Sequence, residues 1–514
     1  MSSLQPQKSS LRRSVSALGA ALLLLGCGYR PARFRAAPPL LVVADEQPIP
    51  RPDRSIFIPE FYEASVYVGR ELTKALDPRH AVEALDVNAV DEVPASSWFR
   101  QAAFIDKPLL GYRRVGPPSL PWRVTSEVAA SETPDAQVVI DARGTRYEVV
   151  PDDPKRPGMK SGASAAASRI LYALGYHTAE VHVVTTPSGE RFTATRWPSE
   201  EDLGPTAKSG VREDDPNDRF DHRDRRSLRG LKFAAAWLDL ATLPPRVFRD
   251  VYVGRPNQGH VEHRLVGIDG ALGVRHYEDD VAWLKDANRE NSNFFLRVFS
   301  LGLSPKPAAF APEPLLPGLG LYEPFVVAEN FSLSPPFAPA DRMRAGDAYW
   351  MAKRIASIPE RVLGRAVLSS KLPPLSQHTL MQLLLLRRAQ VVAWGYGLVS
   401  PLEPGLVSPP NPKTGALARL QFVDLAVASR MADRRLSSYQ VRFLDGENRP
   451  IGPSVILTSS TAVVKVELPA SSVLADYVVV AVTARRAGRA LPFAVQLHLR
   501  RRQGALVLVG VQHD

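Results

Sequence analysis

The hydrophobic pattern changes from helical to strand spacing near Leu417, and that change requires a fold that combines helices with sheets. From Ala340 to about Leu398, apolar residues recur at helical spacing, most regularly in "SQHTLMQLLLLRRAQVVAWGYGL". After Leu417, short runs such as "AVVKVEL", "DYVVVAVTA" and "ALVLVGV" are separated by turns, which is typical of strands. The sequence therefore predicts an α+β protein, with a mixed body over residues 81–400 and an all-β sandwich over residues 412–514.

Turn and cap residues predict the elements of the body. A β-hairpin is expected over Ala136–Val150, with its turn at Arg143-Gly144. Gly175 ends a helix that is expected over Ser161–Leu174, and "EVHVVTT" then alternates as a strand. An apolar helix is expected over Leu228–Leu240, and "HVEHRLVG" reads as a further strand.

The first 27 residues predict export and a lipid anchor. A short basic stretch precedes the uncharged run "SVSALGAALLLLG", which has the layout of a secretory signal and is too short to span a bilayer. The run ends in "LLGC", which resembles the bacterial lipobox, where cleavage leaves the cysteine at the N-terminus carrying a diacylglycerol. We expect a lipoprotein signal peptide over residues 1–26 and lipidation of Cys27. The alternative is an ordinary signal peptide with an incidental cysteine.

The lone cysteine and its neighbour indicate a location. Cys27 is the only cysteine, so disulfides are excluded even in an oxidising compartment. Gly28 after it resembles the pattern of lipoproteins that Gram-negative bacteria send to the outer membrane. The expected location is the bacterial cell envelope, lipid-anchored in the outer membrane and facing the periplasm or the surface.

The net positive charge of the chain indicates which partners it is expected to bind. The net charge of +11 falls to +8 when residues 1–26 are removed, because they carry three basic residues and no acid. A basic protein on a lipid anchor is expected to meet the membrane and an unidentified envelope protein or polyanion. The basic residues are scattered among acids without interleaved aromatics, so nucleic acid is not an expected partner. Residues 27–80, rich in Pro and Arg, are predicted to form the anchor and a tether.

The sequence lacks the motifs of the common catalytic classes. It contains neither the His-Glu-x-x-His of zinc hydrolases nor a Gly-x-Ser-x-Gly nucleophile elbow. "PGMKSG" and "GPTAKSG" resemble a phosphate loop, but neither has a glycine directly before the lysine or the required spacing between glycines. No cofactor is therefore expected.

The segment from Arg212 to Gly230, "REDDPNDRFDHRDRRSLRG", holds six carboxylates, six arginines and a histidine. Its Asx residues predict a turn, because such side chains bond to their own backbone, and a helix is expected to begin near Arg225. The charges nearly cancel, so we expect internal Arg–carboxylate pairs. Three interpretations remain open: a structural clamp, a partner-binding loop, and a catalytic or metal-binding loop. The residues concerned are Asp214, Asp215, Asn217, Asp218, His222, Arg225 and Arg226.

Several joined blocks resemble an uncharacterised bacterial family of exported proteins and lipoproteins. The blocks are "DVNAVDEVPASSWF", "KSGASAAASRILYALGYHTAEVHVV", "REDDPNDRFDHRDRRSLRGLKFAAAWLDL" and "RMRAGDAYWMAKRIASI", which together span roughly residues 80–400. The family's layout is similar to an atypical kinase-like fold, akin to HipA-type and lipid-kinase-type enzymes. The resemblance therefore implies a two-lobed, kinase-like α+β body between the anchor and the β-sandwich.

The same resemblance implies that the body is not an active kinase. Such a fold needs a strand lysine for the phosphates, an aspartate to orient the attacking hydroxyl, and an asparagine and an aspartate for magnesium. Aligned motif by motif, these four positions fall on Val150, Thr242, Val247 and Gly267, none of which supplies that chemistry. The resemblance thus implies a pseudokinase that has no catalytic residue and acts by binding or scaffolding.

Three nearby acids keep an active alternative open. Asp239 and Asp269 flank the substituted positions, with Asp269 two residues beyond Gly267 on the same face of a presumed strand. Together with Asp250 they are candidates for a displaced, vestigial metal or nucleotide site. The alternative function is a metal-dependent phosphotransferase or nucleotide-binding protein. A third possibility, an envelope hydrolase, has no motif in its favour.

Overall fold

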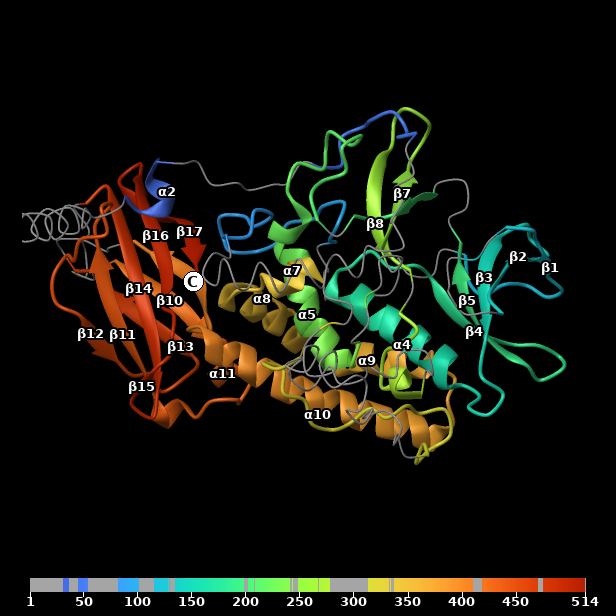
Figure 1. Cartoon of the computed structure of the whole chain (residues 1–514). Coiled ribbons are helices and arrows are strands. Elements are labelled where there is room, and N and C mark those ends of the chain that lie inside the picture. The colour runs from blue at the N-terminus through green and yellow to red at the C-terminus, as the bar shows by residue number, and fades with distance from the viewer. Residues whose placement is uncertain are drawn as a thin grey trace, which may run out of the picture.

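A computed structural model of the chain describes residues 31–36, 45–53, 82–100, 115–127, 129, 135–197, 202–207, 209–240, 243, 248–266, 268–277, 313–331, 333, 337–409, 418–469 and 475–513. Helices and several antiparallel sheets make up this part of the chain, so the predicted α+β class is confirmed. Figure 1 shows a five-stranded sheet at one end, helices in the centre and a β-rich part, the β unit (residues 402–513), at the other end.

The five-stranded sheet has the strand order β1-β2-β3-β5-β4. Its strands are β1 (Arg123–Val124), β2 (Gln137–Ile140), β3 (Arg146–Pro151), β4 (Val181–Thr185) and β5 (Arg191–Arg196). The predicted hairpin is confirmed, since β2 pairs antiparallel with β3 and Ile140 lies opposite Arg146.

Helix α4 (Met159–Leu174) packs against β4 and β5 of this sheet. Its many Ala, Gly and Ser residues let nearly the whole helix lie buried. The predicted end at Gly175 is confirmed: φ is 116° there, and a Cβ would lie 2.6 Å from the Arg100 carbonyl oxygen. The helix therefore ends where only glycine fits.

The central helices are α5 (Arg226–Leu238), α7 (Ala338–Asp341), α8 (Ala345–Ser357), α9 (Glu360–Leu368) and α10 (Pro374–Leu398). Helices α5, α8 and α10 approach one another closely at two glycines. A Cβ at Gly230 would lie 2.9 Å from the Trp350 ring, and one at Gly395 would lie 2.5 Å from the Ala352 Cβ. One large apolar core joins these helices to α4.

A small sheet, β6-β7-β8, lies beside the start of α5 (Figure 1). It consists of β6 (Asp202–Pro205), β7 (Phe248–Val253) and β8 (His260–Leu265). Residues 45–53 run next to it, because Ile49 bridges to Gly259 and the Tyr252 hydroxyl donates to the Ile49 carbonyl at 2.7 Å. This segment is therefore packed on the body.

The β unit contains two antiparallel sheets that enclose one apolar core. The smaller sheet has the order β13-β10-β9, and the larger has the order β12-β11-β14-β16-β17, with β15 paired to β14. The strands are β9 (Leu402–Ser408), β10 (Arg419–Asp424), β11 (Ser437–Leu444), β12 (Val455–Leu457), β13 (Val463–Glu467), β14 (Tyr477–Arg486), β15 (Arg489–Ala490), β16 (Val495–Arg502) and β17 (Ala505–Gln512), with the short helix α11 (Leu425–Ala428) after β10.

Part of the outer face of the larger sheet is covered by the N-terminal chain. Helix α2 (Arg33–Ala36) places Phe34 in an apolar cluster with Ala89, Tyr477 and Val479. Composition predicts a tether over residues 27–80, whereas residues 31–36 and 45–53 are packed parts of the fold. The physical reason is that Phe34 covers apolar surface that the β unit cannot cover by itself.

Buried polar contacts join the β unit to the central helices. The His513 Nδ1 lies 2.6 Å from Asp91 Oδ2, and the Tyr349 hydroxyl donates to Glu403 at 2.7 Å. Lys353 of α8 also pairs with Glu403 at 2.8 Å. Among the residues described, no helix combines the length and the apolar character needed to cross a bilayer.

Candidate functional site

The charged loop before α5 lies against the small sheet, and its charges are paired inside the molecule. A short 3-10 turn, His222–Asp224, leads to Arg225, which is extended (φ −93°), and α5 begins at Arg226. The predicted helix start near Arg225 is therefore confirmed. The internal Arg–carboxylate pairs that the sequence predicts are also present.

Asp218 is the centre of the loop. One of its oxygens accepts hydrogen bonds from the Arg212 backbone N–H at 2.7 Å and from His222 Nε2 at 2.6 Å, and the other accepts from Arg225 Nη2 at 2.7 Å. His222 Nδ1 faces the Ala207 carbonyl, so both of its ring nitrogens face oxygen acceptors.

Asp250 on β7 forms a second centre. It accepts hydrogen bonds from Arg212 Nη1 at 2.8 Å, from His263 Nδ1 at 2.7 Å and from the Thr206 hydroxyl. The Trp98 ring stacks on His263 with a centroid separation of 3.7 Å, and Arg225 lies over the same indole. The two carboxylates are thus connected through Arg212 and held under an aromatic cover.

The charges around the two centres stabilise ionised carboxylates. Burial raises the pKa of Asp218, but the hydrogen bond from His222 and the charges of His222, His263 and Arg225 outweigh burial and hold that pKa well below its usual range. Burial likewise raises the pKa of Asp250, and the charge of His263 and its hydrogen bond outweigh it, so the pKa is lowered. Asp215 is the exception, because burial raises its pKa.

The other loop residues have local or connecting roles. Asp214 pairs with Arg212 at 2.8 Å. Asp215 accepts from the Asn217 N–H at 2.9 Å, which is the predicted Asx turn, and the Asn217 amide donates to the Gln47 carbonyl at 2.9 Å. The loop therefore closes on itself and also holds residues 45–53.

Arg226, the first residue of α5, connects three parts of the chain. Its Nη1 donates to Asp91 at 2.6 Å, its Nε donates to Asp347 of α8 at 3.0 Å, and its backbone N–H donates to Asp86. Asp86 and Asp91 belong to the "DVNAVDEVPASSWF" block, which the structure places against the loop. All seven predicted loop residues therefore make contacts that favour a structural clamp.

The three candidate metal ligands make contacts with three different sets of residues. Asp239, at the end of α5, lies 3.1 Å from Arg275 Nη2 and 3.1 Å from His276 Nε2, and Arg387 Nη2 lies 4.0 Å away. Burial raises the pKa of Asp239, but Arg275, His276 and Arg387 outweigh it and lower that pKa. Asp250 belongs to the loop network instead.

Asp269 lies in a turn after β8, whereas the sequence suggested a strand. It accepts a hydrogen bond from the Ser164 hydroxyl at 3.1 Å and pairs with Lys160 Nζ at 3.6 Å. Within the described ranges, no group of three His, Cys, Asp or Glu side chains is arranged to hold a metal ion. The structure therefore does not unite Asp239, Asp250 and Asp269 in one metal site.

The start of α4 is filled by a carboxylate of the chain itself. Asp152 accepts from the Gly158 N–H at 2.7 Å, from the Ser161 N–H at 2.8 Å and from the Ser161 hydroxyl at 2.7 Å. Arg191 lies beside them and donates to the Ser161 hydroxyl at 2.9 Å. "PGMKSG" thus forms a helix N-terminus whose N–H groups, the usual phosphate ligands, already bind Asp152.

Of the four positions aligned with kinase functional residues, only Val150 lies among the described residues. Val150 lies in β3, opposite Thr193 of β5, and is buried in the body. Thr242, Val247 and Gly267 lie outside the described residues, as does Cys27.

Sequence reasoning missed several charged partners of these sites. Arg387 of the "LLLLRRAQV" run donates to the Trp237 carbonyl at 3.0 Å and so caps the end of α5. Arg275, Asp45 and Lys160 carried no local signal, because their respective partners Asp239, Arg225 and Asp269 lie far away in the sequence. Arg387 was the one partner that the sequence could have indicated, because a charged residue inside an apolar helix usually has a buried partner.

Comparisons with known proteins gave one structural similarity. No family model and no curated protein match this sequence. CtkA, a proinflammatory kinase from Helicobacter pylori, is similar in structure with a TM-score of 0.33 and 9% sequence identity, over 55% of this chain and 97% of the kinase. At that TM-score we transfer neither a site nor an activity.

Proposed function

We propose that this protein is a lipid-anchored protein of the bacterial envelope whose pseudokinase-like α+β body binds or scaffolds a partner and catalyses no reaction. The observation that carries the proposal is that the acids nearest the expected catalytic positions are neutralised within the chain. Asp239 is 1% exposed and Asp250 is 0% exposed, and each has an arginine and a histidine as partners.

This pairing opposes metal binding. Magnesium requires oxygen ligands in near-octahedral geometry and keeps several waters, so it needs accessible carboxylates. A metal at Asp239 would have to displace Arg275 and His276 and would lie beside Arg387. The two arginines are buried, and their charges repel a cation. Breaking one such buried pair costs about 3–5 kcal/mol.

The start of α4 supports the same proposal. A nucleotide phosphate at this helix N-terminus would compete with Asp152, which already accepts three hydrogen bonds there. Arg191, whose Nε lies 3.4 Å from Asp152, is held between Ser161 and the Ser370 carbonyl, to which it donates at 2.6 Å. The groups that would recognise phosphate are therefore engaged in the fold.

One observation favours the alternative function. Lys160 and Asp269 form a partly exposed ion pair, with side-chain exposures of 20% and 28%, and Ser164 adds a hydroxyl. A lysine beside an aspartate is the minimum that phosphate and magnesium recognition require. If the protein binds nucleotide, this cluster is where we expect it.

Thermal unfolding of residues 28–514 with ATP and magnesium or manganese tests the proposal. We expect no change in melting temperature at millimolar nucleotide, because we expect no binding. If nucleotide did bind, a concentration of a hundred times the dissociation constant would add about 2.7 kcal/mol of stability and raise the melting temperature. A metal-dependent rise that Asp269→Ala abolishes, and that Glu467→Ala on the exposed surface of the β unit retains, would establish the alternative instead.

The lipid anchor is tested separately. In a Gram-negative host fed an alkyne analogue of palmitate, we expect the full chain to be labelled, because lipidation of a lipobox cysteine adds acyl chains there. Cys27→Ser should abolish the label and leave the uncleaved precursor in the membrane fraction. A labelled Cys27→Ser chain, or an unlabelled parent chain cleaved after the signal, would contradict the anchor.

A further inference from the structure

The end of the β unit that lies opposite α2 is formed by two adjacent turns. The first is a short 3-10 turn, Arg434–Leu436, that leads into β11, and the second joins β14 to β15. The Ala487 N–H donates to the Leu436 carbonyl at 2.7 Å, so the two turns lie side by side. Figure 1 shows α2 at one end of the β unit and β15 at the other.

Five arginines, which define what we call the arginine end, are grouped on and beside these turns: Arg430, Arg434, Arg435, Arg485 and Arg489. Within the described part of the chain, none of the five forms an ion pair. Arg434 Nη1 donates to the Ser460 carbonyl at 2.7 Å, and Arg485 Nη2 donates to the Gly488 carbonyl at 2.6 Å. These two contacts orient a guanidinium group without neutralising its charge.

The acids near the two turns do not offset this charge. Asp433 is the one acid within residues 430–436 and 485–493, and its carboxylate accepts a hydrogen bond from the Arg435 backbone N–H at 2.8 Å. Arg486, the sixth arginine of these two ranges, already pairs with Asp424 at 2.7 Å. Five arginines against one aspartate therefore leave the arginine end strongly positive.

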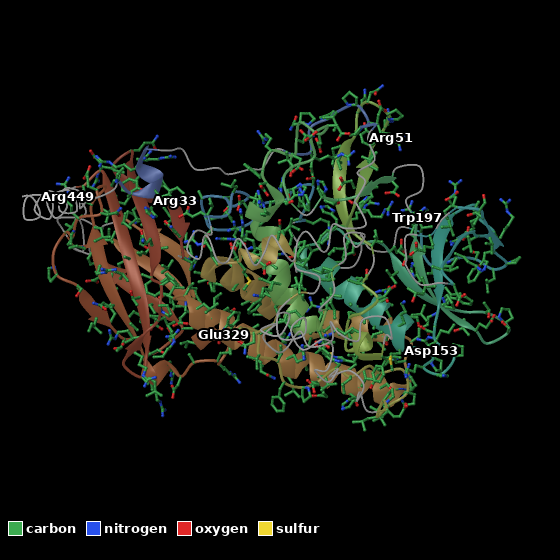
Figure 2. All side chains as sticks on the ribbon, viewed as in Figure 1. Arg33, Arg51, Asp153, Trp197, Glu329 and Arg449 are labelled. Carbon is green, nitrogen blue, oxygen red and sulfur yellow. The ribbon has the colours of Figure 1, made fainter. Side chains whose placement is uncertain are left out.

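The α2 end of the β unit differs, because it is covered and its charge is paired. The Phe34 ring packs edge-on against His498 of β16 with a centroid separation of 4.9 Å. Arg500 donates to the Phe34 carbonyl at 2.9 Å. Arg33 of α2, labelled in Figure 2, pairs with Glu83 at 2.8 Å. The arginine end is thus the end of the β unit that is open to a charged partner.

Apolar side chains are exposed beside the five arginines. Leu436 is 58% exposed, Phe493 is 44% exposed and Met431 is 37% exposed. Residues 430–436 and 485–493 contain no lysine. Protein-binding surfaces are enriched in arginine, methionine and aromatic residues and depleted in lysine. An anionic glycan, in contrast, has no apolar side chain to cover Leu436.

A lipid surface fits the arginine end less well than a protein does, because the proposed anchor belongs to the other end. The chain from Cys27 to Pro31, which precedes α2, reaches at most about 14 Å. Strand β14 has ten residues and separates the α2 end from the arginine end by about 30 Å. An anchor on Cys27 would therefore hold the α2 end at the bilayer and leave the arginine end away from it.

We infer that the arginine end binds an acidic segment of a partner protein that also carries apolar side chains. Guanidinium groups bind carboxylates in a bidentate manner, which supplies the charge recognition. The exposed Leu436 and Met431 supply the apolar contact. The inference deepens the proposed binding role, on which it rests, by naming the surface and the class of partner.

Fluorescence anisotropy on residues 28–514 tests the inference with two labelled peptides. In the first, pairs of Glu alternate with single Leu, and in the second, Ser replaces every Leu. We expect both peptides to bind more weakly as salt is added, because salt screens exposed charges, and the Leu peptide to bind more tightly than the Ser peptide. Arg435→Gln with Arg489→Gln should weaken both by about threefold for each arginine, as expected for exposed ion pairs.

Two further variants separate the apolar contact from the overall charge. Leu436→Ser should weaken binding of the Leu peptide by about fourfold, since burial of one methylene group corresponds to about that factor, and should leave the Ser peptide unchanged. Arg255→Gln with Arg365→Gln removes two charges from exposed positions of the β7–β8 turn and of α9, and should leave binding of both peptides unchanged. Thermal unfolding should show that every variant keeps the parent's melting temperature.

Three outcomes would overturn the inference. The first is that neither peptide binds, and the second is that the two double variants lose binding equally. The third is that heparin or phosphatidylglycerol vesicles bind through Arg435 and Arg489 while the peptides do not, which would assign the arginine end to a glycan or to lipid.

The inference and the proposed function can fail separately. A metal-dependent rise in melting temperature with ATP, together with peptide binding that Arg435→Gln with Arg489→Gln weakens, would refute the non-catalytic body and retain the arginine end. No such rise, together with no peptide binding, would retain the non-catalytic body and refute the arginine end.

Discussion

Replacing Asp218 with alanine is expected to lower the free energy of unfolding by about 4 kcal/mol, because it breaks the buried ion pair with Arg225 and removes the carboxylate that contacts His222. The substitution leaves Arg225 and His222, both 0% exposed, without the carboxylate that pairs with them. It also removes the acceptor of the Arg212 N–H. Thermal unfolding of residues 28–514 should show the melting temperature fall by about 4 °C, because the unfolding entropy of a chain this long is large.

An exposed ion pair provides the control. Glu467 pairs with Arg419 at 2.7 Å, but the two side chains are 54% and 45% exposed, so Glu467→Ala should cost less than about 1 kcal/mol. If Asp218→Ala melts within a degree or two of Glu467→Ala, the loop is not a clamp. Partner contact would then become the better interpretation of its charges.

The loop shows what local sequence can and cannot predict. Its turn and the helix start at Arg226 follow from the side chains of Asp215 and Asn217 and from the apolar spacing that comes after them. The partners of its arginines do not, because Asp250 lies 38 residues from Arg212, and Asp347 lies 121 residues from Arg226. Charge balance predicts that pairs exist, and only the tertiary fold decides which residues form them.

The N-terminal segment shows a second limit of prediction from local sequence. Prolines and arginines on both sides of Phe34 indicate an irregular linker, and nothing within the segment distinguishes a free chain from a docked one. Docking depends on a strand more than 450 residues away, where Gly510 leaves the space that the Phe34 ring fills. Spacing along the chain likewise could not reveal the side chains that lie against Asp239, Arg275 and His276.

Acidification is expected to destabilise the fold between pH 6.5 and pH 4 through His498, the histidine beneath Phe34. Burial, reinforced by the charge of Arg33, lowers the pKa of His498 to about 4. Nε2 of this ring has no hydrogen-bond partner among the described residues, so a proton there has no acceptor. An unfolded histidine titrates near 6.5, so below that pH the unfolded state takes up the proton before the folded state does, and stability falls. At pH 5 the loss should be about 2 kcal/mol.

The measurement compares thermal unfolding at pH 7 and pH 5 in three proteins of residues 28–514. The variants share every other titratable group with the parent. His498→Gln should therefore reduce the difference in unfolding free energy between pH 7 and pH 5 by about 2 kcal/mol. His378→Gln, at an exposed position of α10, should leave that difference unchanged. The carboxylates with lowered pKa values, such as Asp218 and Asp250, lose their contribution only at still lower pH, so the two windows are separate. Equal pH dependence in the parent and His498→Gln would mean that the ring takes up a proton without loosening Phe34, and that the docking of α2 does not depend on a neutral histidine.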